Sequence, residues 1–204
     1  MHTFKNGYNN DIWIGQGQAY TVSGGLQWLS DAKPAVLWFY VAWNKSNIPK
    51  HSFIYWLRSH NRLLTKHRLK RIGIIHDEVC YLCGVDDETH THLFYECQYS
   101  RKYITLLQQF LRVNFRLELL HHWTKNNRGI SRMQRQLVGA CHVGVVYAIW
   151  EARNHTKHND SILMPRVQVK EVVRMVKQRF WSMNEYSLSD KELHWLATIK
   201  SQNM

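Results

Sequence analysis

The sequence predicts a mainly α-helical protein. Apolar residues recur mostly at helical spacing along the 204 residues, and strand-like alternation is confined to short pieces such as residues 18–22. Hydrophobic residues make up 45% of the chain and include nine tryptophans, enough to build a folded core. The longest apolar run, residues 35–43, is about half the length of a membrane-spanning helix, so we expect a buried helix there and no membrane association.

Two prolines predict helix starts in the first half of the chain. A proline in the first turn of a helix costs no backbone hydrogen bond, so Pro34 and Pro49 can each open one. Beyond Pro49, the side chains of Phe53, Trp56 and Leu57 fall on one face of the expected helix. A short helix follows within residues 63–73.

That short helix carries its own boundary signals. The hydroxyl of Thr65 can cap its first turn, and Gly73 can end it by adopting a positive φ. Two longer helices are expected at residues 103–115 and 132–154. The second has an apolar face with four residues spaced at i, i+4: Met133, Leu137, Cys141 and Val145.

The C-terminal part is expected to form two more helices. One begins at Pro165, and its apolar side is made of Val169, Val172, Val173, Val176 and Phe180. The last covers residues 189–200 and can open with a capping box between Ser189 and Glu192.

Three of the four cysteines lie between Asp77 and Arg101. The first 16 residues lack the basic and apolar regions of a secretory signal, so we expect the chain to stay in a reducing compartment, the nucleus or the cytoplasm. Clustered cysteines in such a compartment favour a metal site over disulfides.

The cysteine spacing predicts a zinc site. Cys80 and Cys83 form a C-x2-C pair that lets two thiolates reach one tetrahedral ion, and Gly84 follows where the turn needs a positive φ. The other two ligands must be Cys97 and either His90 or His92. We favour His92, because the apolar residues 93–95 can then pack the hook onto its neighbours.

The ligand set defines the role of the zinc. Three thiolates and one imidazole fill all four positions of a tetrahedral ion and leave none for a reactive water, so we expect a structural zinc. Asp86 and Asp87 sit inside the zinc loop without the strand-like flanks of a polymerase acid pair, and we expect the acids of this stretch to be solvated.

No catalytic constellation is apparent elsewhere. Cys141 and His142 are adjacent, and adjacent residues of a helix point about 100° apart, which is poor geometry for a nucleophile and its base. The sequence has no G-x-S-x-G elbow and no phosphate-cradling glycine loop. We therefore expect a protein that is not an enzyme.

The formal net charge of +12 predicts a polyanionic partner, RNA or DNA. Residues 32–76 contain no acid. The expected phosphate-contacting residues beside the zinc hook are Arg58, Arg62, Lys66, Arg68, Lys70 and Arg71. A second basic stripe has helical spacing and consists of Arg166, Lys170, Arg174 and Lys177; a solvated helix face explains this stripe equally well.

With these motifs in order, the chain resembles the zinc-binding domain at the C-terminal side of the reverse transcriptase in plant non-LTR (LINE-type) retrotransposon polyproteins. Residues 11–29 and 42–74 are similar to the domain's first segment and to its helix pair. The hook Cys80, Cys83, His92 and Cys97 matches its Cys-x2-Cys-Gly…His-Leu-Phe-x-x-Cys pattern, and residues 146–158 look like the helix ending Ile-Trp-x-x-Arg-Asn that often follows.

The resemblance implies nucleic-acid association. We expect an irregular helical domain built around one structural Cys3His zinc hook, with a zinc-binding module over residues 1–100 and a basic helical extension over residues 101–204. Because the chain begins at Met1 just ahead of the module, we expect a stand-alone fragment without the polymerase. The alternative function is a zinc-stabilised protein-interaction module, adopted by the host, whose tryptophan-rich helices dock a partner.

Overall fold

The computed structural model describes residues 37–113, 130–183 and 188–200. The chain divides into two units, and all of these residues belong to the second, Leu37–Met204. The expected helix start at Pro34 and the first 36 residues of the expected zinc-binding module lie outside the described residues.

The described residues are mainly helical, as predicted, and the only β pairing among them is an isolated bridge between Val79 and Asp87. The helices are α3 (Leu37–Ala42), α4 (Pro49–Ser59), α5 (Lys66–Arg71), the π-helical turn η1 (His92–Glu96), α6 (Gln98–Leu111), α8 (Arg132–Asn159), α9 (Pro165–Met183) and α10 (Asp190–Lys200).

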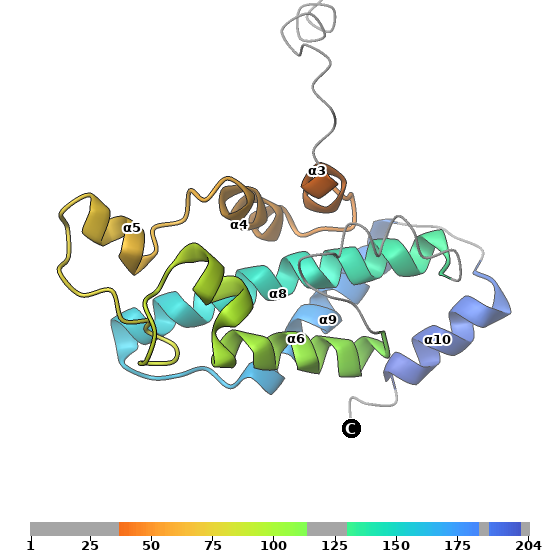
Figure 1. Ribbon diagram of the computed structural model, residues 1–204. Coiled ribbons are helices and arrows are strands. Elements are labelled where there is room, and N and C mark those ends of the chain that lie inside the picture. The colour runs from red at the N-terminus through yellow and green to blue at the C-terminus, as the bar shows by residue number, and fades with distance from the viewer. Residues whose placement is uncertain (1–36, 114–129, 184–187, 201–204) are drawn as a thin grey trace, which may run out of the picture. The chain divides into compact units, whose positions relative to one another are not determined.

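Helix α8 is the centre of this unit. Helices α4, α6 and α9 all pack against it, and Figure 1 shows it running between them. The predicted apolar face, Met133 to Val145, is buried, and so is the valine side of α9. Cys141 belongs to this core: burial raises the pKa of its thiol to about 12 and lowers the pKa of the neighbouring His142 to about 3.

Local signals set the helix boundaries where the sequence predicted them. Pro49 occupies the first turn of α4, and the Thr65 hydroxyl accepts a hydrogen bond from the backbone N–H of Arg68 at the start of α5. Gly73 has a φ of +73° just beyond α5. Before α10, the backbone N–H of Ser189 donates to the Glu192 carboxylate. These contacts satisfy backbone groups that a helix end leaves open.

The expected junction between the zinc-binding module and the extension falls within a helix. Helix α6 continues through residues 100 and 101. It packs against η1, which belongs to the expected module, and against α8 and α9, which belong to the expected extension. The division at residue 100 stays a prediction. Among the described helices, none is both long and apolar enough to span a bilayer.

A glycine allows α8 to approach α4 and α9 closely. A Cβ added at Gly144 would lie 2.5 Å from Cγ1 of Val172 on α9 and 3.4 Å from the ring of His51 on α4. His51 is fully buried and stacks on the ring of Tyr147. The side chain of residue 144 therefore has to be a hydrogen atom for α9 to pack as it does.

We predict that Gly144→Ala lowers the free energy of unfolding by about 1–3 kcal/mol, because Val172 is β-branched and packed and must shift. The matched control is Gly139→Ala in the same helix, where a Cβ meets nothing within 4 Å; it should stabilise the protein by roughly 0.5–1 kcal/mol. Urea unfolding measures both. Equal effects of the two substitutions would contradict the packing account.

Candidate metal centre

The first two metal-ligand candidates lie on a tight loop after α5. Cys80 and Cys83 flank a turn in which the backbone N–H of Gly84 donates to the Cys80 carbonyl at 2.9 Å. Gly84 has a φ of +67°, the conformation predicted for it. The loop is closed by a bond from the Cys80 N–H to the Asp86 carbonyl at 2.8 Å. The two thiols therefore belong to a short, backbone-bonded loop.

The other two candidates lie at the ends of the π-helical turn η1. The N–H of Cys97 donates to the carbonyl of His92 at 2.7 Å, an i→i+5 bond that widens the turn. In an α-helix, residues five apart project in different directions, whereas the wider turn returns them to nearly the same side. With four residues between them, His92 and Cys97 can therefore bind the same metal ion.

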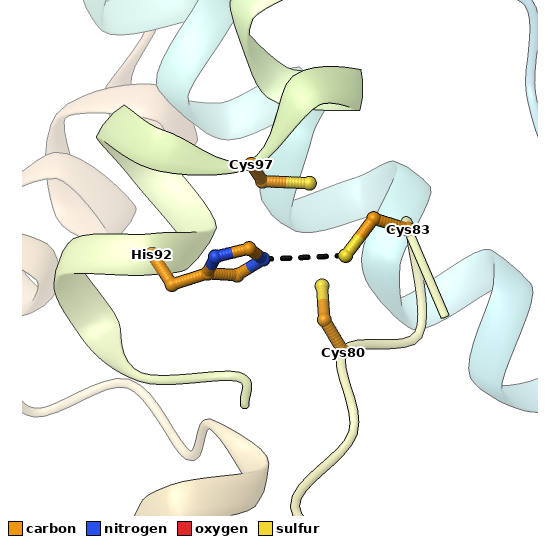
Figure 2. A group of neighbouring side chains, drawn as sticks. All are labelled: Cys80, Cys83, His92 and Cys97. Atoms are coloured by element: carbon orange, nitrogen blue, oxygen red, sulfur yellow. Dashed lines mark hydrogen bonds between the residues drawn. The ribbon is translucent and has the colours of Figure 1, made fainter. Parts of the chain in front are cut away.

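All four side chains converge on one point. Their ligand atoms, three cysteine sulfurs and an imidazole nitrogen, lie within 4.8 Å of one another, with Cys83 Sγ 3.4 Å from His92 Nε2 (Figure 2). A tetrahedral zinc at about 2.3 Å from sulfur and about 2.0–2.1 Å from nitrogen would separate these atoms by roughly 3.5–3.8 Å. The donor set and its spacing fit zinc, and Cys80, Cys83, His92 and Cys97 would hold it.

The electrostatics of the cluster favour thiolate. A hydrogen bond from the Cys80 thiol, together with the backbone N–H groups of Ser100 and Tyr99, lowers the pKa of Cys97 to about 5. The same bond to Cys97, together with burial, raises the pKa of Cys80. Cys97 is the N-cap of α6, where the helix dipole also favours negative charge. Zinc binds the thiolate form of cysteine, so the lowered pKa of Cys97 favours metal binding.

His90 lies outside the cluster, and His92 is the histidine that joins it. The His90 ring packs against Phe94 instead, at 5.1 Å between centroids. On the far side of the His92 ring, Nδ1 lies 3.8 Å from the exposed Asp86 carboxylate. That separation is longer than a hydrogen bond. Asp86 therefore stays an exposed acid near the histidine, as expected for this loop.

Glu88 corrects the expectation that the acids of this stretch are solvated. Its side chain is completely buried, and its carboxylate accepts hydrogen bonds from three parts of the chain. The backbone N–H of Lys66 donates at 2.9 Å, that of Tyr81 at 3.3 Å, and the guanidinium of Arg153 at 2.7 and 2.9 Å. The zinc loop, the start of α5 and the helix α8 meet at this one carboxylate.

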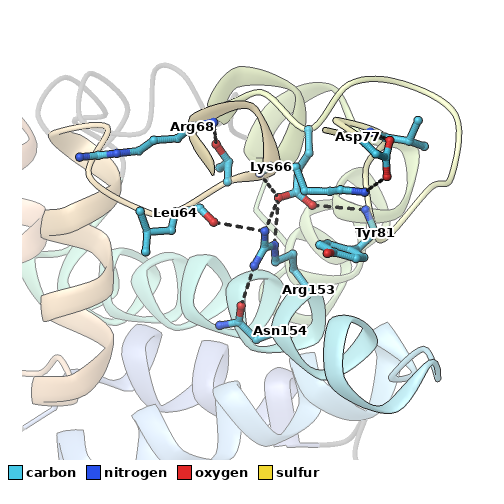
Figure 3. Close-up of polar contacts among 10 residues, drawn as sticks. Leu64, Lys66, Arg68, Asp77, Tyr81, Arg153 and Asn154 are labelled. Atoms are coloured by element: carbon cyan, nitrogen blue, oxygen red, sulfur yellow. Dashed lines mark hydrogen bonds and ion pairs between the residues drawn. The ribbon is translucent and has the colours of Figure 1, made fainter. Parts of the chain in front are cut away.

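The side chain of Arg153 is also buried, and its guanidinium is in contact with several groups. Besides Glu88, it donates to the Leu64 carbonyl at 3.2 Å and to the Asn154 side chain at 3.0 Å (Figure 3). Its guanidinium also lies 5.0 Å from the ring centres of Tyr81 and Trp150. The Trp-x-x-Arg-Asn pattern of residues 150–154 was visible in the sequence, but its partner Glu88 carried no signal that set it apart from Asp86 and Asp87.

Ion pairs attach α5 to the segment before Cys80. Lys66 pairs with Asp77, and both Lys70 and His67 pair with Glu78. These contacts hold the pKa values of the two carboxyls below their usual range, mainly through the hydrogen bonds from Lys66 and Lys70. Since Asp77 is well exposed, we assign such pairs to orientation of the loop more than to stability.

Three of the ten residues expected to contact phosphate are buried. The guanidinium of Arg58 lies among aromatic rings, 4.6 Å from the centre of Tyr95, and only 7% of the residue is exposed. Lys66 is buried beneath Tyr81, and Lys177 is buried on the core side of α9. Their burial removes these three residues from the expected surface: an amphipathic pattern cannot show that a cation is enclosed by aromatic rings.

The exposed and partly exposed candidates form two groups, apart from Lys70, which is paired with Glu78. Arg62, Arg68 and Arg71 line one cavity beside the zinc loop. On α9, Arg166 is exposed and Lys170 partly so, while the Arg174 guanidinium is paired with Glu171 at 2.5 Å. The C-terminal stripe is thus interrupted by an ion pair and by the buried Lys177. The structure brings together only the first group.

Residues 20–103 match the model of a family described as zinc-binding in reverse transcriptase. This segment contains a zinc-binding domain of the reverse-transcriptase type. The described part of the match holds α3, α4, α5, the zinc loop and η1, and the four converging side chains lie inside it. No curated protein and no solved structure gives a significant match to the chain. The domain's partners in the second half of the chain, such as Arg153, lie beyond the matched residues.

We predict that His92→Ala weakens zinc affinity by more than about 100-fold, because losing a ligand costs more than losing a residue that merely supports one, for which roughly 10–100-fold is typical. His90→Ala is the matched control and should keep one zinc per chain. Zinc content by elemental analysis, with thermal unfolding before and after chelation, measures the effect. Loss of zinc from the His90 variant alone would reverse the ligand assignment.

We predict that Arg153→Met lowers the free energy of unfolding by about 3–5 kcal/mol, since it leaves the Glu88 charge buried without its cation. Arg174→Met removes an arginine from an exposed pair, whose side chains are 61% and 48% accessible, and should leave the free energy of unfolding nearly unchanged. Denaturant unfolding of the zinc-loaded proteins compares them. If both substitutions lowered the free energy of unfolding by similar amounts, the buried charge of Glu88 would not need Arg153 for its stability.

Proposed function

We propose that the protein is a non-catalytic, zinc-stabilised nucleic-acid-binding protein that contacts the phosphates of RNA or DNA. The observation that carries this proposal is the grouping of Arg62, Arg68 and Arg71 around one cavity beside the zinc loop. The chain's net charge of +12 would add attraction at longer range.

The cavity has the chemistry of an anion site. Its volume is about 440 Å³, and no carboxylate is among the described residues that line it. Arg68 donates to the Asn61 carbonyl at 2.8 Å, which orients its guanidinium beside the cavity. Guanidinium groups bind phosphate oxygens through pairs of parallel hydrogen bonds, so three of them suit the successive phosphates of a nucleic-acid backbone.

The zinc supports this function without taking part in chemistry. A Cys3His set fills the coordination sphere, which leaves no position for an activated water. The family match supports an origin in a retroelement reverse transcriptase, and we propose the non-LTR type on the motifs described above. Nucleic acid and reduced thiols both belong to the nucleus or the cytoplasm, where we propose that the protein acts.

The alternative, a protein-interaction module, rests on exposed aromatic side chains. On and beside α3, Phe39, Tyr40 and Trp43 are each about half exposed or more. Aromatic residues are enriched in protein interfaces, so these side chains give that reading a physical basis. It predicts binding that depends little on salt.

We predict that Arg62→Gln combined with Arg71→Gln reduces the salt dependence of RNA and DNA binding. Each phosphate contact that is lost should lower the slope of log affinity against log salt by roughly 0.7–0.9. Affinities measured between about 50 and 200 mM salt give the slope.

The control for that experiment removes the same charge elsewhere. Lys102→Gln combined with Lys191→Gln takes two exposed lysines from α6 and α10, neither of which lines the cavity, and should leave the slope nearly unchanged. An equal change in both double variants would mean that only net charge matters. Absence of binding by the zinc-loaded wild type at low salt would favour the protein-interaction module.

A further inference from the structure

Helix α4 has one buried side and one aromatic side. Tyr55 and Arg58 face inward. Phe53, Trp56 and His60 follow one another at i, i+3 and i+7, the last just after the helix, so they share the other side. Phe53 is 53% exposed, Trp56 is partly exposed and His60 is exposed. We call these three residues the aromatic row.

The rings of the aromatic row are in contact with one another. Phe53 and Trp56 stack with 5.9 Å between centroids and 28° between planes. Trp56 meets the His60 ring at 5.2 Å, and Trp38 of α3 meets the same His60 ring at 5.0 Å. Neighbouring rings restrain each other, so the row is a preorganised surface of π faces and edges.

His60 also lines the arginine cavity. The aromatic row therefore runs directly into the group formed by Arg62, Arg68 and Arg71. No acid occurs in residues 32–76, and no carboxylate is among the described residues that line the cavity, although Glu78 contacts the lining residue His67. Surfaces that bind single-stranded nucleic acids combine aromatic rings, on which bases stack, with positive charges that contact the phosphates. The aromatic row and the arginine cavity supply both.

We propose that the aromatic row and the arginine cavity form a binding track for single-stranded nucleic acid. Bases stack on Phe53, Trp56 and His60, while the phosphates that follow them enter the cavity. This inference rests on the proposed function and adds the form of its ligand. In a duplex the base faces are covered by their neighbours, so a stacking surface can engage only unpaired bases.

The dimensions agree with a short stretch of strand. Phe53 and His60 are seven positions apart, which at helical spacing is a rise of about 10 Å. Stacked bases are spaced by about 3.4 Å along one strand, so the row offers room for two or three of them. The adjoining guanidinium groups favour a polyanion over a neutral apolar peptide as the occupant.

The test compares single strands with a duplex on the full-length, zinc-loaded protein. Fluorescence anisotropy measures binding to a short labelled RNA, to the DNA of the same sequence, and to a hairpin duplex. We expect both single strands to bind at least about 10-fold more tightly than the duplex. We expect Trp56→Ala to remove about 10-fold or more of the single-strand affinity and to leave duplex binding unchanged.

Two kinds of control keep the result interpretable. Trp181→Ala removes another exposed tryptophan, from α9, and should leave single-strand affinity unchanged. Because Trp56 is partly buried, Trp56→Phe should retain most of the affinity, and His60→Ala should reproduce the loss through an exposed residue. Thermal unfolding of each variant reports whether it is folded.

The outcomes separate this inference from the function on which it rests. If Arg62→Gln with Arg71→Gln weakens binding to all three ligands while Trp56→Ala and His60→Ala do not, the protein binds phosphates and the aromatic track is wrong. Equal affinity for duplex and single strand would also overturn the track. If none of the three ligands binds at low salt, the nucleic-acid function falls and the track with it.

Discussion

The arrangement of this protein around its zinc site depends on one buried carboxylate. Glu88 lies in the zinc loop, yet its side chain accepts hydrogen bonds from the first residue of α5 and from Arg153 of α8. Its backbone carbonyl also accepts from the N–H of His67. A buried charge is tolerated only when it is paired and fully hydrogen-bonded, so each of these donors is constrained to its place. Loop, helix and core are thereby held in one geometry.

The zinc cluster and Glu88 both fix the position of the segment between Cys80 and Cys97. Cys80, Cys83, His92 and Cys97 close the loop, while Glu88 attaches it to α5 and α8. The arginine cavity is built from residues around α5 together with His90 of the loop, so its shape follows from both attachments. In this account the zinc has no chemistry of its own. It keeps a set of positive charges together that would otherwise repel one another.

Signals within a few residues predicted their structures well. Pro49, Thr65 and Gly84 each impose a local backbone conformation, and the C-x2-C…H-x4-C spacing is itself short-range, so the helix starts and the metal ligands could be read from the sequence. Contacts over long sequence separation could not. Glu88 and Arg153 are 65 residues apart, and nothing local distinguishes Glu88 from its two exposed acidic neighbours. Arg58 was misplaced for a related reason, because the aromatic rings around it come partly from the zinc hook.

We propose that zinc shapes the surface that binds nucleic acid. Titration of zinc into the chelated protein, with affinity for a short single-stranded RNA measured at each step, tests it most directly. We predict that affinity rises with added zinc and stops rising at one zinc per chain, and that the His92→Ala variant gives no such rise. An affinity that is the same with and without zinc, in a protein that binds one equivalent, would contradict it.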